Sequence, residues 1–193
     1  MRILAFFAFL LFATSVARAD LFEFTDEGIA LDGPPGWTVL TISDIRYLHR
    51  DADFGSEEIK RRIHSNDPTH ILSVVSKADV GGVSPGLHLF YRPGGIDDTD
   101  DHLNRLQDYL SRNAQDYRPI SGPGKTRLGA FEAGSLTYQY VVMNGARRVI
   151  VEETVWVVSM GRHHLTLSSG TAPGDDTGKR QIRDAVRSLR ALN

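Results

Sequence analysis

The 193-residue chain contains no cysteine. Disulfide bonds, thiolate metal sites and a cysteine nucleophile are therefore excluded, and so is an N-terminal cysteine that could carry a lipid anchor. The net charge is also small, at −2 with neutral histidines. A chain with so little excess charge gives no electrostatic reason to expect nucleic acid or an anionic membrane as its partner.

Long apolar runs are missing too, except at the N-terminus. Residues 3–13 are apolar without interruption, but this run is shorter than the roughly 20 residues that span a bilayer. Arg2 precedes the run and Ala17-Arg-Ala19 follows it, which matches the charge and cleavage pattern of signal peptides. We expect residues 1–19 to be a cleaved signal peptide, with an uncleaved interfacial anchor as the alternative. Residues 20–193 are then expected to form one soluble domain, periplasmic or secreted, without a membrane partner.

Three apolar-rich segments separated by tight turns dominate the second half of the chain. Leu136–Val142 alternates or nearly alternates in polarity. The apolar runs Val149–Val151 and Val155–Val158 form the second segment, and His163–Ser168 is the third; this pattern predicts three strands. Asn144-Gly145 is a strong hairpin signal, and Gly161 marks the next turn. The three segments predict an antiparallel meander. Such a meander must bury at least one face, so the rest of the chain should cover it.

The remaining segments predict helices and further strands around this meander. Leu103, Leu106 and Leu110 recur at spacings of three and four, which predicts a helix near residues 99–115, and residues 179–191 carry a second apolar helical face. The other expected elements are a hairpin of Leu21–Phe24 and Ile29–Leu31, strands at Trp37–Ile42, His70–Val75 and Gly86–Tyr91, a short helix from Ser56, and loops at 43–55 and Tyr117–Thr126. Together these elements predict a single α+β domain with a mostly antiparallel sheet of about seven strands flanked by helices.

Two stretches contain the letters of known motifs but fail their structural requirements. The sequence Gly82-Val-Ser-Pro-Gly86 matches a nucleophile elbow, which needs a strand before the serine and a helix after it. Here both neighbours are predicted strands, and Pro85 has no N–H to donate to an oxyanion, so we expect a hairpin loop. Residues 122–126 resemble part of a phosphate-binding loop but lack its first glycine. We therefore expect neither enzymatic activity nor a cofactor.

The densest group of potential metal ligands is a short acidic run. It consists of Asp97, Asp98, Asp100, Asp101 and His102. These side chains could hold a cation, but the run lies at a predicted helix start, where carboxylates accept hydrogen bonds from free N–H groups. It also lacks the spacing and central glycine of a calcium loop. We favour helix capping over metal binding for this run.

A second candidate site is the uncovered face of the predicted sheet. Glu152 and Glu153 point to opposite faces of one strand, so one of them should lie on a buried or concave face. A cross-strand partner such as Arg147, Arg148 or Arg162 is the structural explanation for such a carboxylate. Aromatic residues that share an uncovered face would line a binding groove, and otherwise they belong to the core. The candidate groove residues are Trp37, Tyr138, Tyr140, Glu152 and Trp156.

The order of these elements resembles that of PsbP-like and Mog1-like domains. The features that carry the resemblance are the N-terminal hairpin, Pro35-Gly-Trp37 opening a strand, the helix at 99–115, the meander at 134–168 and the terminal helix at 179–191. The resemblance implies an α/β/α sandwich around an antiparallel sheet, acting as a binding or accessory module without catalysis. It brings no catalytic motif. The residues with which photosynthetic or nuclear-transport members engage their partners have no counterpart in this chain.

The sequence therefore favours an exported, non-catalytic domain that binds another protein. One alternative is a periplasmic protein that binds a small ligand or a metal, using the uncovered sheet face or the acidic run. Another is an immunity or adaptor protein for a secreted toxin. A hydrolase would need Glu152, Glu153 or a histidine beside a pocket, which the sequence alone does not reveal.

Overall fold

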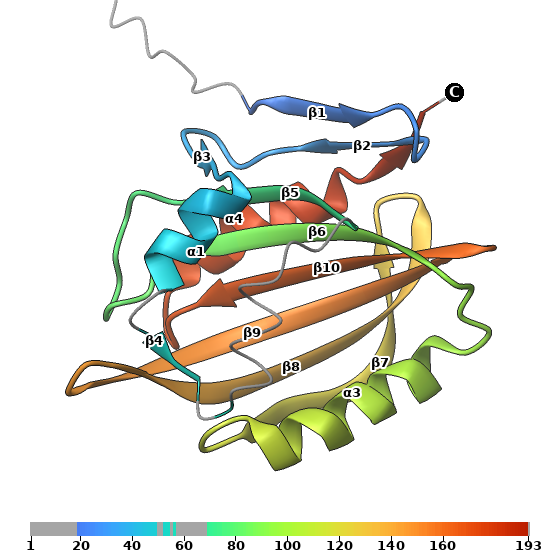
Figure 1. The fold of residues 1–193 in the computed structure, drawn as a ribbon. Coiled ribbons are helices and arrows are strands. Elements are labelled where there is room, and N and C mark those ends of the chain that lie inside the picture. Colours follow the sequence, from blue (N-terminus) through green and yellow to red (C-terminus); the bar gives the residue numbers. More distant parts are fainter. Residues whose placement is uncertain (1–18, 50–51, 55, 57–68, 193) are drawn as a thin grey trace, which may run out of the picture.

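The computed structural model describes residues 19–49, 52–54, 56 and 69–192. Its centre is an eight-stranded antiparallel sheet with the order β3-β5-β6-β10-β9-β8-β4, in which β7 also pairs with β8 (Figure 1). These strands are β3 (Thr38–Val39), β4 (Ala52–Asp53), β5 (His70–Val75), β6 (Gly86–Pro93), β7 (Arg118–Leu128), β8 (Phe131–Asn144), β9 (Arg147–Met160) and β10 (His163–Thr171). A smaller antiparallel sheet contains β1 (Leu21–Phe24), β2 (Ile29–Asp32) and β11 (Arg190–Ala191).

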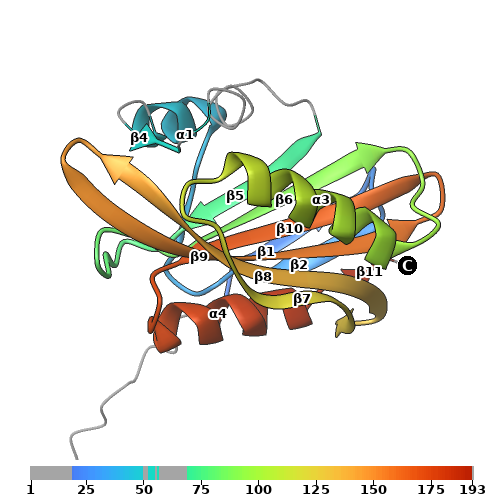
Figure 2. The same cartoon turned by 90° about the horizontal axis from the view of Figure 1, so that it is seen from below.

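The helices cover both faces of the main sheet. Helices α1 (Ile42–His49) and α3 (Thr99–Asn113) lie on one side of it, and α4 (Asp176–Arg187) lies on the other (Figure 2). The side with α1 and α3 is called the α3 face below, and the opposite side the α4 face. This arrangement is the predicted α+β sandwich, and the main sheet has slightly more strands than the sequence suggested.

Each face has its own apolar core. On the α4 face, side chains of β6 and β10 pack with α4 and the small sheet. The buried residues of this core include Ile29, Leu31, Leu87, Leu89, Leu165, Leu167, Ile182 and Val186. On the α3 face, Leu103 and Leu110 of α3 pack on Leu136, Val155 and Val157. Strand residues alternate between the two faces, so the same strands supply both cores.

The predicted meander is confirmed as β8, β9 and β10. Its two turns contain Gly145 and Gly161, whose φ angles of 60° and 72° lie in the left-handed region that glycine adopts without strain. The hairpin between β8 and β9 pairs Asn144 with Arg147 and continues without a register shift to Gly134 and Val157. The meander therefore forms a continuous platform on which side chains of both faces are fixed in register.

Both amphipathic helices form, with small differences in their ends. Helix α3 begins after Asp98, whose side chain accepts hydrogen bonds from the backbone N–H groups of Asp100 and Asp101. Helix α4 begins after Asp175, which accepts one from Gly178 at 2.9 Å. The terminal helix thus spans Asp176–Arg187 rather than 179–191, and the chain then adds β11 to the small sheet.

Two predicted loops contain regular structure instead. Within 43–55, α1 forms because Thr41 and Asp44 make a reciprocal capping box: the Thr41 N–H donates to the Asp44 carboxylate at 2.8 Å, and the Asp44 N–H donates to the Thr41 hydroxyl at 3.2 Å. The predicted strand Trp37–Ile42 accordingly shortens to β3. The predicted loop Tyr117–Thr126 is mostly β7, whose prolines and glycines are accommodated by two register shifts against β8.

Two expectations concern residues outside the described ones. The predicted signal peptide falls almost wholly on residues 1–18, and the helix expected from Ser56 falls on 57–68. In the part of the chain that the structure describes, no helix is long and apolar enough to cross a membrane.

Candidate functional site

A cleft of about 640 Å³ lies on the α3 face of the main sheet. Its walls come from the segment that contains α1 and β4 and from strands β5, β6, β8, β9 and β10, while no described residue of α3 lines it. Much of the lining is apolar; it includes Leu40, Ile45, Phe54, Val75, Val149 and Val151. Its volume and apolar lining are typical of small-molecule sites, which measure roughly 300–1,000 Å³.

Two glycines on neighbouring strands form part of the floor of the cleft. Gly86 of β6 and Gly170 of β10 are direct cross-strand partners, and Gly170 is also opposite Glu153 of β9. A Cβ atom on Gly86 would lie 3.5 Å from the His88 ring, and one on Gly170 would lie 3.5 Å from the Val151 side chain, both ordinary contact distances. Neither glycine has a positive φ. The missing side chains therefore leave a hollow beside Glu153 that no tight packing or backbone strain requires.

Among the described residues that line this cleft, Glu153 is the one with a carboxyl group. It lies opposite Tyr138 on β8, and its carboxyl group is hydrogen-bonded to the hydroxyl groups of Tyr138 and Tyr140. Burial raises the pKa of Glu153 to about 7, although the two tyrosine hydrogen bonds act in the opposite direction. Burial, together with the nearby Glu153 charge, also raises the pKa of both tyrosines well above the ordinary value. In the described part of the chain, Glu153 forms no salt bridge.

A second polar group of the cleft joins β5 and β6. The Ser73 hydroxyl lies 2.6 Å from His70 Nε2 and 2.5 Å from His88 Nδ1. Both histidines line the cleft, but Ser73 itself has no exposed surface. The Phe90 ring packs against His70 with centroids 5.2 Å apart. The hydroxyl therefore links and orients the two imidazole rings and is not presented to a bound molecule.

The five predicted groove residues do not form one groove, because they lie on two faces. Tyr138 and Tyr140 are on the α3 face beside Glu153, and Tyr138 is buried in the core under α3. Trp37 is buried on the α4 face, where its Nε1 donates to Gln181 at 3.2 Å. Glu152 and Trp156 also face α4 and line another groove. The carboxylate that accompanies the tyrosines is thus Glu153 rather than Glu152.

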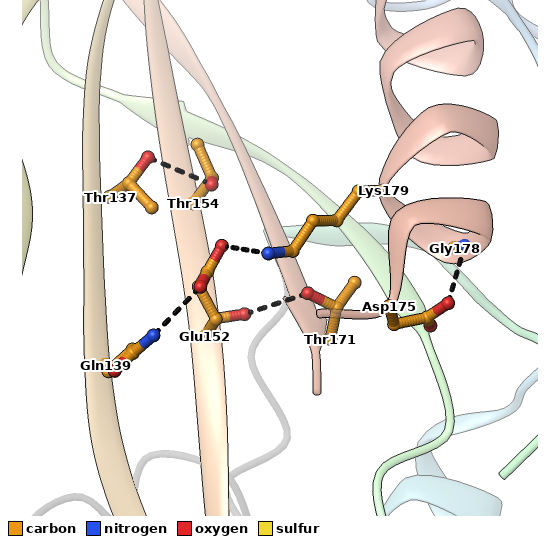
Figure 3. A network of polar contacts seen from close by, with 8 residues as sticks. All are labelled: Thr137, Gln139, Glu152, Thr154, Thr171, Asp175, Gly178 and Lys179. Carbon is orange, nitrogen blue, oxygen red and sulfur yellow. Dashed lines mark hydrogen bonds and ion pairs between the residues drawn. The ribbon is translucent and has the colours of Figure 1, made fainter. Parts of the chain in front are cut away.

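Glu152 takes part in a separate polar network on the α4 face (Figure 3). Its carboxylate lies 2.5 Å from Lys179 Nζ of α4 and accepts a hydrogen bond from Gln139 at 2.9 Å. Burial is the largest effect on its pKa and raises it, but the hydrogen bonds from Lys179 and Gln139 and the lysine charge leave the pKa below its ordinary value. The predicted arginine partner was wrong: a helix lysine neutralises Glu152, and Arg148 pairs with Asp116.

The hydroxyl groups of Thr137 and Thr154, 3.1 Å apart, lie next to this ion pair on the same face (Figure 3). Together with Trp156, they line a groove of about 370 Å³ between β7 and α4. The groove is smaller than the cleft of the α3 face, and its carboxylate already has a cationic partner.

The acidic run does cap α3, as predicted. Asp98 is the N-cap residue, and Asp101 forms an ion pair with Arg105 one turn later. His102 points to His164, with ring centroids 5.4 Å apart; burial, then the charge of His164, lowers its pKa. Among the described residues, no group of three histidine, aspartate or glutamate side chains could hold a metal ion.

The sequence contained a signal for the tyrosine–glutamate cluster that the prediction did not use. In an antiparallel hairpin, the residue numbers of any two opposite residues add up to the same sum. For a two-residue turn this sum is odd. An even-numbered residue of β8, such as Tyr138, therefore shares its face with an odd-numbered residue of β9. That rule selects Glu153 over Glu152. The glycine hollow and the His70–Ser73–His88 group gave no comparable signal, because they depend on pairings between distant strands.

The chain was compared with known proteins, and no family model and no curated protein matches it. Several solved structures do resemble it. Cyanobacterial PsbP (CyanoP) from Synechocystis sp. PCC 6803 superposes with a TM-score of 0.58, at 12% identity over 93% of this chain and 96% of that one. LpqN of Mycobacterium tuberculosis, described as involved in cell envelope biogenesis, gives a TM-score of 0.52, at 13% identity over 91% and 86%.

A protein of unknown function from Pseudomonas aeruginosa, PA94, gives a TM-score of 0.50, at 11% identity over 91% of this chain and 99% of that one. At such low identities the likeness shows the fold and nothing about ligands or partners. The chain therefore has the PsbP-like fold that the order of its elements predicted.

Proposed function

We propose that this protein is an exported, non-catalytic binding domain that takes a small organic ligand into the cleft of the α3 face. The observation that carries the proposal is the glycine pair Gly86 and Gly170. Glycine inside a strand costs about 0.5–1 kcal/mol relative to alanine. Here neither backbone conformation nor close packing demands it. A floor without side chains beside the half-buried Glu153 carboxyl group, the one carboxyl group among the described lining residues, leaves room for a ligand next to a polar anchor.

Three further observations support the proposal. The lining combines apolar side chains with a few convergent polar groups, Glu153, His70 and His88, as in sites that bind organic molecules. Ser73, the hydroxyl that two imidazoles could activate, has no exposed surface, which favours binding over nucleophilic catalysis. The signal-like N-terminus and the involvement of LpqN in cell envelope biogenesis favour a function outside the cytoplasm.

The experiment is a ligand screen by thermal shift on the purified protein and on Gly170→Val. Valine suits a strand and projects into the hollow. We expect hits in the wild type whose stabilisation is lost in this variant, because a ligand raises the melting temperature only when it binds the native state. Thr166→Val is the control, since Thr166 is on the same face of β10 but does not line the cleft.

Stabilisation that persists in Gly170→Val would overturn the cleft as the binding site, and a screen without hits would overturn the small-ligand function. The protein partner expected from the sequence stays a prediction. Crosslinking the tagged protein in its own compartment tests it, and a stoichiometric partner recovered equally with wild type and Gly170→Val would favour that function instead.

A further inference from the structure

We propose that the ligand of the cleft carries a protonated amine on an apolar body, and that the Glu153 carboxylate binds this amine. The inference rests on the proposed function and specifies its ligand class. It begins from the position of Glu153, which lines the cleft next to the glycine hollow. The side chain is fixed there by hydrogen bonds with Tyr138 and Tyr140.

The carboxyl group has acceptor capacity left for a ligand. An ionised carboxylate offers about four lone-pair sites, and two tyrosine hydroxyls occupy only part of them. The tyrosines also hold the group still: the rings of Tyr138 and Tyr140 are 5.9 Å apart, and Tyr138 packs in turn against Tyr117 at 5.6 Å. A pre-oriented acceptor loses little conformational entropy when it binds a donor.

A buried carboxylate is normally paired with a cation, because its desolvation is costly. Glu152, the preceding residue, has Lys179, whereas Glu153 has no salt bridge among the described residues. Among the described residues, the other titratable groups that line the cleft are Tyr140 on β8, His70 on β5, His88 on β6 and the exposed Lys77 after β5. A cationic ligand would therefore supply the counter-charge that Glu153 does not receive from any described residue.

The remaining lining fits such a ligand. The aromatic side chains of Phe54 and Tyr140 line the same cleft, and aromatic faces attract cations. Phe90 lines it too, but the Arg92 guanidinium already lies over its ring, 5.0 Å from the centroid. Val149 and Val151 continue the β9 row away from Glu153 and offer apolar surface for a carbon skeleton. An anionic ligand would place a second negative charge beside Glu153 and is disfavoured for the same electrostatic reason.

The test compares three probes with one skeleton: phenethylamine, phenethyl alcohol and hydrocinnamate. Binding is measured by calorimetry at about pH 8, where Glu153 is ionised. We expect the amine to bind at least ~10-fold more tightly than the alcohol, the gain from a charge-assisted hydrogen bond, and the carboxylate to bind most weakly. Glu153→Gln should remove the preference for the amine. Glu152→Gln, a matched change on the opposite face, should keep it.

A second measurement needs no variant. In wild-type protein, NMR titration of the Glu153 side chain should show its pKa falling when phenethylamine is bound, and the amine affinity should increase as the pH rises through about 7. Equal binding of amine and alcohol, with both lost in Gly170→Val, would overturn the amine inference and leave the proposed function standing. A preference for the amine that survives Glu153→Gln would overturn it too. Binding of none of the probes, when the wider screen gives hits, also counts against it.

Discussion

Replacing the two floor glycines with alanine tests whether the cleft is a hollow reserved for a ligand. The variants are Gly86→Ala, Gly170→Ala and the double substitution. Each new methyl group would meet its nearest neighbour at 3.5 Å, without a close contact to the backbone. Because neither residue has a positive φ, an alanine fits the existing backbone at both positions.

The expected effect on stability follows from backbone entropy. Glycine inside a strand is destabilising by roughly 0.5–1 kcal/mol relative to alanine, so each substitution should stabilise the ligand-free protein by about that amount. For a chain of this size, 1 kcal/mol corresponds to about 2–4 °C in melting temperature. The two methyl groups are cross-strand neighbours, so their effects in the double variant need not be additive.

The assay is urea denaturation without ligand, followed by measurement of ligand affinity. We expect higher stability and weaker binding in the same variant, the combination that marks a site retained for function. Gly134→Ala is the control on the same sheet face: its Cβ would lie 2.8 Å from Leu103 Cδ1 and 3.0 Å from Thr99 Cβ under α3. Such overpacking costs about 1–3 kcal/mol. If the cleft variants lose as much stability as Gly134→Ala, the hollow is filled and the reasoning is refuted.

Three further predictions concern charged side chains. Burial raises the pKa of Glu153 from 4.5 to about 7. Its contribution to the free energy of unfolding is therefore complete below pH 4.5 and is lost, by up to ~3 kcal/mol, as the pH rises through 7. Urea denaturation of Glu153→Gln should show that this pH dependence of stability is gone, and an unchanged dependence would contradict the burial of the carboxyl group. Lys179→Met should destabilise the protein by ~1 kcal/mol at neutral pH. Because the pKa of Glu152 is lowered, this loss of stability should disappear as the pH falls through the pKa of Glu152. A loss that does not depend on pH would mean that missing packing, and not missing charge, is responsible. Asp98→Ala should destabilise the protein by ~1 kcal/mol, while Asp98→Asn should stay near wild type, because asparagine also caps helices. If calcium stabilises the wild type in thermal melts and neither variant, the result would favour a metal site instead.

Local patterns were sufficient to predict most of the fold. In the β8–β9–β10 meander the strands are rich in apolar residues and each turn contains a glycine, and α3 and α4 have aliphatic faces and aspartate caps. In each case the information lies within a few residues of sequence. The loops were less predictable: Thr41 and Asp44 form a capping box that is too short a pattern to distinguish from a polar loop.

The candidate site was harder to predict because it depends on pairing between distant strands. Gly86 and Gly170 are far apart in sequence and meet only when β6 pairs with β10. Hairpin geometry also left a choice for Tyr138. A turn centred on Asn144-Gly145 would place it opposite Val151, whereas the observed turn at Gly145-Ala146 places it opposite Glu153. The face of the sheet is the same in both registers, and only the partner changes.

The lengths of the elements explain why the α3 face has a cleft at all. Strands β8 and β9 have 14 residues each, or about 46 Å at 3.3 Å per residue. Helix α3 has 15 residues, or about 22 Å at 1.5 Å per residue. One helix of this length cannot cover such strands from end to end, and the α1–β4 segment forms a wall over the remainder.

Glu153 lies where the cover changes from α3 to that wall, since Val155 is in the α3 core and Val151 lines the cleft. The α4 face is covered differently, by α4 and the three-stranded sheet together, and Glu152 on that face is neutralised by a lysine of the covering helix. Two consecutive carboxyl groups therefore have pKa values shifted in opposite directions, because strand geometry gives one a helix partner and leaves the other facing the cleft. In the proposed complex, the bound amine does for Glu153 what Lys179 does for Glu152.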